Sequence, residues 1–164
     1  MREILFRGKR LDNGEWTEGY LYEHEPALVG IVSEKDVPEP SKWFIVRTGF
    51  ADWNMPRPVE FVEVDPSTVG QYTGLNDKHG KRIFEGDILR IAKIADELGG
   101  YYRPPLDYTV NVVVKWDLCA WMWETLCDDN KRYITFPDAW RLYECEIIGN
   151  AHDNPELLKE EAQP

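Results

Sequence analysis

Three carboxylates near the middle of the chain are the residues best suited to chemistry. Asp77, Glu85 and Asp87 flank one glycine-rich hairpin, with turns expected at Gly80 and Gly86. Carboxylate oxygens that converge from two turns are ligands that Mg²⁺ or Ca²⁺ prefers, so the three residues are candidate metal ligands. Their spacing matches no calcium-binding loop. The alternative, which the sequence favours, is that they accept hydrogen bonds from backbone N–H groups of their own turns.

The histidines and cysteines offer no recognisable site. No two of them stand at the spacing of a zinc site or of a C-x-x-C pair. The odd cysteine count argues against a disulfide framework and is typical of a reducing cytoplasm. The cysteines lie in apolar or aromatic segments, where a thiolate is disfavoured. These residues are His24, His79, His152, Cys119, Cys127 and Cys145. The sequence therefore assigns no cofactor and no catalytic residue.

A group of aromatic residues in the second half of the chain is a candidate interaction site. Its members are Trp116, Trp121, Trp123, Trp140 and Tyr143. If exposed, such rings form a stacking platform or the centre of a protein interface. Trp121 and Trp123 alternate along an expected strand and share one face, which more often belongs to a core. Both roles stay open at this point.

The elements that would position these residues are short strands. Apolar runs alternate with turn residues along the chain, and Asn13-Gly14 is a strong hairpin signal. The count comes to about ten strands, which predicts an all-β protein. We expect either a β-barrel or two small SH3-like, barrel-like halves. Asn154-Pro155-Glu156 has the cap, first-position proline and acidic first turn of a short C-terminal helix.

The length fits a single domain over residues 1–164, with two β-rich subdomains of about 1–66 and 67–164 as a finer division. A weak internal echo supports that division. Residues 13–21 and 79–88 both run from a turn glycine through a bulky apolar residue and Glu-Gly into an apolar strand.

The charge of the chain limits its partners. A net charge of -11 repels phosphate backbones, so nucleic acid is a disfavoured partner. The acidic charge is explained by the solubility it gives a small protein, and mimicry of DNA is a second interpretation of it. The first residues lack the apolar run of a signal peptide, and no window has the length of a membrane span. We therefore expect a protein of the host-cell cytoplasm without a membrane partner.

Three stretches together resemble a known family. They are MREILFRG at 1–8, GQYTGLNDKHGKRIFEGDI at 70–88 and IIGNAHDNPELL at 147–158. Their composition, order and spacing are similar to those of the YopX family of phage and prophage proteins, and the resemblance spans nearly the whole chain. It implies a β-rich protein of unassigned molecular function. It also implies a homo-oligomer, and it carries no catalytic residues.

These observations favour a non-enzymatic phage or prophage accessory protein that acts through protein binding. The expected partner is a further copy of the chain, or a host or phage protein. One alternative is a small metal-assisted hydrolase or ligand-binding β-barrel that uses Asp77, Glu85 and Asp87. Another is a nucleic-acid-binding barrel that stacks bases on exposed aromatic rings, which the net charge opposes.

Overall fold

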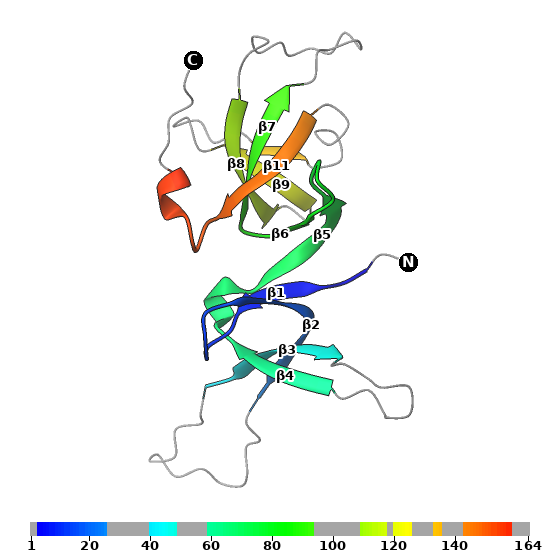
Figure 1. Cartoon of the computed structure of the whole chain (residues 1–164), viewed down its shortest axis with the longest axis vertical. Coiled ribbons are helices and arrows are strands. Elements are labelled where there is room, and N and C mark those ends of the chain that lie inside the picture. Colours follow the sequence, from blue (N-terminus) through cyan, green and yellow to red (C-terminus); the bar gives the residue numbers. More distant parts are fainter. Residues whose placement is uncertain are drawn as a thin grey trace, which may run out of the picture. The chain divides into compact units, whose positions relative to one another are not determined.

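The computed structural model of the protein describes residues 3–25, 40–48, 59–93, 109–117, 120–125, 133–135 and 143–158. Within these ranges the regular structure consists of β-strands and two short 3-10 helices (Figure 1). The elements are β1 (Phe6–Lys9), β2 (Trp16–His24), β3 (Lys42–Thr48), β4 (Val59–Val64), η1 (Pro66–Thr68), β5 (Gly70–Asn76), β6 (Arg82–Phe84), β7 (Asp87–Lys93), β8 (Thr109–Asp117), β9 (Ala120–Thr125), β10 (Tyr133–Thr135), β11 (Tyr143–Asn150) and η2 (Pro155–Leu158). The prediction of an all-β protein is confirmed, and η2 stands where the short C-terminal helix was expected.

The strands pair into two antiparallel sheets rather than one closed barrel. Their orders are β4-β3-β2-β1-β5-β6 and β10-β9-β8-β7-β11. The chain divides into two compact units, Met1–Gln71 (unit 1) and Tyr72–Pro164 (unit 2). Strand β5 crosses this division, because its first residues pair with β1 and its later residues pair with β6.

Two glycines set the local geometry of unit 1. Gly14 has a φ of 72°, so the Asn13-Gly14 hairpin between β1 and β2 is confirmed. Gly19 lies inside β2, where a Cβ atom would come within 2.4 Å of the Val46 carbonyl oxygen. The backbones of β2 and β3 therefore approach closely at Gly19, and a larger residue there would push β2 away from β3.

Unit 1 is a curled sheet with a small core. Ile45 and Val64 are almost fully buried on its inner side. Beyond the end of β1, Arg10 forms an antiparallel bridge with Val64, and the Leu11 N–H donates to the Glu63 carbonyl oxygen at 3.1 Å. The end of β1 therefore lies beside the end of β4, although the two strands are at opposite ends of the β4-β3-β2-β1 order.

Unit 2 is built around the β7–β8–β9 ladder, with β11 on the other side of β7. Apolar side chains alternate along these strands, so one face of the sheet carries a contiguous core. Its buried members are Ile83, Leu89, Ile91, Val112, Val114, Trp121, Trp123 and Cys145. The hairpin that contains the candidate carboxylates contributes Ile83 to this core.

Among the described residues we find no helix with the length and apolar character that crossing a membrane requires.

Candidate protein-binding surface

Asp77 is a buried turn residue. Its Oδ1 accepts hydrogen bonds from the backbone N–H groups of His79 and Lys81, both at 2.9 Å. Its Oδ2 accepts one from Ile147 in β11 at 3.3 Å. Burial alone would raise the pKa of this carboxyl group, but the hydrogen bonds from Lys81, Ile147 and His79 outweigh burial and lower it. The structure thus shows the backbone role that the sequence favoured for Asp77.

Asp87 and Glu85 also have backbone partners. Buried Asp87 accepts from the Phe84 N–H at 2.8 Å and from the Asn150 side-chain amide at 3.2 Å. Glu85 accepts a longer hydrogen bond, 3.4 Å, from the Trp116 N–H in β8 rather than one in its own turn. Across the described ranges, no group of three or more His, Cys, Asp or Glu side chains is placed to hold a metal ion. The three candidate ligands are therefore not gathered into one such group.

The candidate aromatic residues lie in different environments. Trp121 and Trp123 are buried in the core of unit 2. Trp116 is 51% exposed, and its ring packs edge-on against Trp121 with the ring centres 5.0 Å apart. Tyr143 is the first residue of β11 and pairs with Lys93, but its side chain is not among the parts of the chain that the structure describes. Trp140 also lies outside the described residues.

Among the described residues, no cysteine or histidine belongs to a group that could hold a metal ion. Cys145 is buried, and burial, with a smaller effect of the Asp77 charge, raises the pKa of its thiol to about 11. His79 is exposed, with its Nε2 3.7 Å from the Glu146 carboxylate. The Nδ1 atom of His24 lies 3.4 Å from the hydroxyl oxygen of Tyr22. Cys119 and Cys127 lie outside the described residues.

A different set of aromatic side chains gathers on the outer side of the sheet in unit 1. Register places Tyr22 opposite Phe44, and Tyr20 and Phe61 opposite Val46, so these side chains project from the same face of β2, β3 and β4. The Tyr22 and Phe61 rings meet edge-on at 6.0 Å, as do Phe44 and Phe61 at 6.3 Å. We call Tyr20, Tyr22, Phe44 and Phe61 the aromatic face.

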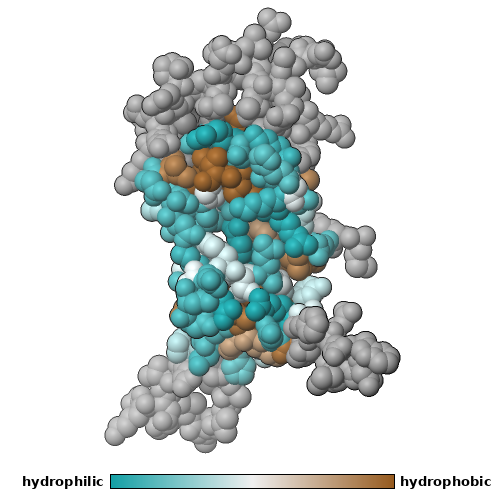
Figure 2. Space-filling model, viewed as in Figure 1, coloured by the Kyte–Doolittle hydropathy of each residue, from teal (hydrophilic) through white to brown (hydrophobic). Residues whose placement is uncertain are grey.

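The aromatic face is open to solvent. Tyr20, Tyr22 and Phe61 are 63%, 45% and 59% exposed. Val59, at the start of β4, is 55% exposed beside them. Figure 2 shows apolar side chains at the surface of both units on the face that it draws. Contiguous exposed aromatic side chains on a sheet are unusual in a surface that contacts only water, and they are typical of a binding surface.

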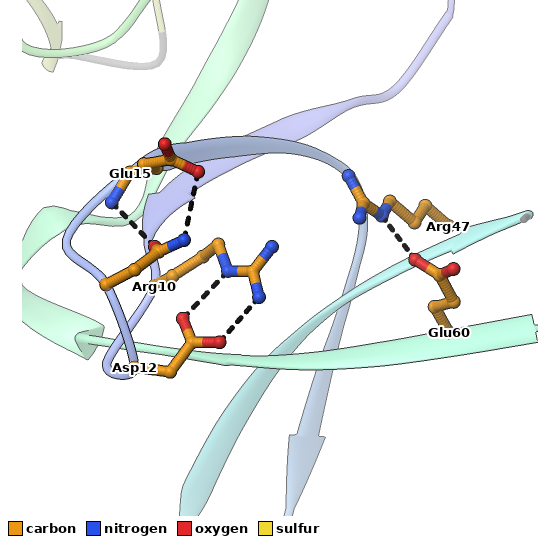
Figure 3. A network of polar contacts seen from close by, with 6 residues as sticks. Arg10, Asp12, Glu15, Arg47 and Glu60 are labelled. Carbon is orange, nitrogen blue, oxygen red and sulfur yellow. Dashed lines mark hydrogen bonds and ion pairs between the residues drawn. The ribbon is translucent and has the colours of Figure 1, made fainter.

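Two ion pairs lie near this surface. One joins Arg47 and Glu60, which alternate with the aromatic-face positions and so project from the other face of β3 and β4, and the other lies in the turn after β1. Arg10 binds Asp12 through two hydrogen bonds, of 2.8 and 2.5 Å, and Arg47 binds Glu60 at 2.7 Å (Figure 3). The hydrogen bond with Arg10 holds the pKa of Asp12 below its usual value, and the same contact raises the pKa of Arg10. These charged groups are held by their partners in the free protein.

A hollow lies between β4 and the chain that follows β1. Its volume is about 350 Å³, and it is lined by Arg10, Leu11, Asp12, Phe61, Val62 and Glu63. Leu11 and Phe61 supply exposed apolar walls, whereas Glu63 and Asp12 supply carboxylates. The aromatic face therefore continues into a site with mixed chemistry.

The aromatic face was not predicted from the sequence. One local signal for it was present, because residues 59–64 carry apolar side chains on both sides of the strand. Only the pairing of β2, β3 and β4 shows that Tyr22, Phe44 and Phe61 meet.

Comparison with known proteins gives a family match and likenesses to solved structures. A family model described as YopX protein matches residues 29–159. The chain is similar to a solved structure described as "Crystal structure of protein EF1440 from Enterococcus faecalis". The two are 22% identical with a TM-score of 0.49, over 96% of this chain and 99% of that chain. A comparison with curated proteins finds no match.

Proposed function

The chain belongs to the YopX family, and we propose that it is a phage or prophage accessory protein that acts by binding protein through the aromatic face. The bound protein is a further copy of the chain, or a host or phage protein. The proposal places the protein in the cytoplasm of the host cell. The observation that carries it is the contact of the Tyr22, Phe44 and Phe61 rings on an exposed sheet face.

The physical argument is that aromatic rings dominate the energetics of protein interfaces. Each buries a large area and loses little conformational entropy, because it has few rotatable bonds. Tyr22 and Phe61 already constrain each other in the free protein. A partner that covers them therefore gains apolar burial without first ordering the surface.

The chemistry of the other candidates supports a non-enzymatic role. The carboxylates of Asp77 and Asp87 are buried and accept hydrogen bonds from backbone and amide groups. A general base or metal ligand needs a carboxylate that a substrate or ion can reach, and the burial of these two groups limits that access. The net charge of -11 opposes binding of bases on the exposed rings, since phosphate groups would accompany them.

A comparison of face variants tests the proposal. We expect a Tyr22→Ser, Phe61→Ser double variant to lose proteins that the native chain captures from host-cell lysate, or to lose its self-association in sedimentation velocity. The matched control is Trp116→Ser, which removes an exposed aromatic ring of unit 2. Capture and mass that are the same in all three proteins would refute a role for the aromatic face.

A further inference from the structure

The backbone of β4 has a defined outer edge. The Glu63 carbonyl oxygen accepts a hydrogen bond from Leu11, and the Asp65 N–H donates to the Lys9 carbonyl oxygen at 2.8 Å. Both groups point to the side of β4 that faces away from β3. Backbone direction alternates along an antiparallel strand, so the N–H and C=O groups of Phe61 and Val59 point the same way.

The described residues cover only part of this edge. The chain beyond β1 pairs with β4 at Val64 and Glu63, and then turns toward β2, with the Gly14 N–H donating to the Arg10 carbonyl oxygen. Among the described strands, none pairs with this side of β4 at Phe61 or Val59. The hollow beside Phe61, Val62 and Glu63 lies at the point where the pairing stops. An extended segment placed there would continue the ladder that the end of β1 begins.

The charge around the edge specifies the chemistry of that segment. Asp12, Glu15, Glu60 and Glu63 supply four carboxylates, and Arg10 and Arg47 supply two guanidinium groups, which leaves two negative charges. Both arginines are already held in ion pairs. In the described part of the chain, no cation is seen paired with the side chain of Glu63. A lysine or arginine side chain fits this site, with its aliphatic stem against Leu11 and Phe61.

We propose that the outer edge of β4, from Val59 to Glu63, binds an extended basic segment of a partner protein as an added β-strand. Its basic residues lie on the face of β4 that carries Glu63, with their aliphatic stems against Leu11 and Phe61, and its apolar residues lie on the other face, beside Val62. The inference rests on the proposed protein-binding function and names the partner's chemistry. A second copy is a poor occupant, because β4 has no basic residue and pairing β4 with β4 would place no cation beside Glu63.

A synthetic peptide serves as the probe. It is a fluorescein-labelled peptide of roughly eight residues in which valine and lysine alternate, long enough to span β4. Binding to the full chain is followed by fluorescence anisotropy. We expect the peptide with glutamate in place of lysine to bind at least about tenfold more weakly, because it meets like charges.

N-methylated peptides test strand addition itself. One peptide carries N-methyl groups on every valine, and another carries them on every lysine. In an added strand only alternate N–H groups face β4, so one of the two peptides should lose binding while the other keeps it. Equal affinity, or an equal loss, would overturn the strand geometry. Hydrogen exchange gives an independent readout, since the amides of Val59 and Phe61 should gain protection when the unmodified peptide binds.

Variants of the protein locate the site. Glu63→Lys should weaken binding of the valine–lysine peptide roughly fivefold or more. Glu156→Lys, the same charge change on η2 in unit 2, is its control. Val59→Pro removes one outward N–H at the first residue of the strand, where proline is tolerated, and should cost about fivefold in affinity. Val59→Ala, which keeps the N–H, is the matched control.

The outcomes separate this inference from the proposed function. If the peptide does not bind, or binds Glu63→Lys as well as it binds the native chain, the edge site is wrong. Protein binding by the aromatic face would stand if capture still depended on Tyr22 and Phe61. If capture is independent of these two residues, the proposed function fails whatever the peptide does.

Discussion

The side chain of Asp77 accepts a hydrogen bond from the backbone of Ile147, 70 positions later in the chain, at 3.3 Å. The same carboxylate accepts two more from its own turn, so it closes the turn and fastens it to β11. A second link runs alongside, because the Lys78 N–H donates to the Cys145 carbonyl oxygen at 3.0 Å. The glycine-rich hairpin is thus anchored to β11, and these contacts hold the two parts of unit 2 together.

Removing the carboxylate of Asp77 should destabilise the protein. Asp77→Ala leaves three backbone N–H groups without this acceptor, which should lower the free energy of unfolding by about 2–4 kcal/mol. Urea denaturation followed by circular dichroism measures the change. Asp12→Ala is the control, since Asp12 is exposed and its contacts are with Arg10 and the backbone of its own loop. Equal losses of unfolding free energy from the two substitutions would contradict the role of Asp77 in anchoring the hairpin to β11.

The stability conferred by Asp77 should depend on pH. The folded-state pKa of this carboxyl group is lowered from its ordinary value of 3.8, so its contribution is present above that value and disappears as the pH falls through the folded-state pKa. The difference in unfolding free energy between the native chain and Asp77→Asn should therefore shrink on acidification below the ordinary value. A difference that is constant from neutral to acid pH would exclude this linkage.

Much of the hairpin could be predicted from the sequence because its determinants are local. Gly80 has a φ of 82°, as the turn that ends on it requires, and Asp77 bonds to N–H groups two and four positions away. The bond from Ile147 to Asp77 could not be anticipated in this way. It depends on how β11 lies beside the hairpin, which only the fold determines.

Gly86 should resist substitution for the same local reason. Its φ is 81°, and an added Cβ would lie 3.4 Å from the Asn150 amide nitrogen, so the strain is mainly in the backbone. Gly86→Val should reduce the free energy of unfolding by roughly 1–3 kcal/mol. Gly86→Asn should cost less, because asparagine tolerates the left-handed region. Identical melting curves for the native chain and Gly86→Val would rule out the strain.

The two sets of aromatic residues show the limit of what could be predicted from the sequence. Trp121 and Trp123 share a face by simple alternation, but whether that face is inside or outside depends on what packs against it. The aromatic face of unit 1 is harder still, since Tyr22, Phe44 and Phe61 come from three strands whose register is set by long-range pairing. Apolar residues on both sides of β4 indicate only that each side is partly covered, and not which strands or rings cover it.

The tryptophans of unit 2 should differ sharply in their contribution to stability. Trp123 has no exposed surface, so Trp123→Ala should cost about 3–5 kcal/mol of unfolding free energy. Trp116→Ala should cost about 1 kcal/mol or less, since half of its side chain is in water. Chemical denaturation of both variants measures the contrast. Similar losses would mean that the exposed ring carries more of the fold than its position indicates.

Cys145 should be inert in the folded protein. Burial in the core of unit 2 raises the pKa of its thiol to about 11, so almost no thiolate is present near neutral pH. In a Cys119→Ser, Cys127→Ser background, which leaves Cys145 alone, a thiol reagent such as Ellman's should react slowly at about pH 8, below the ordinary thiol pKa. The same protein in concentrated urea is the control and should react at once. Fast labelling of the folded protein would show that β11 opens more readily than its pairing with β7 implies.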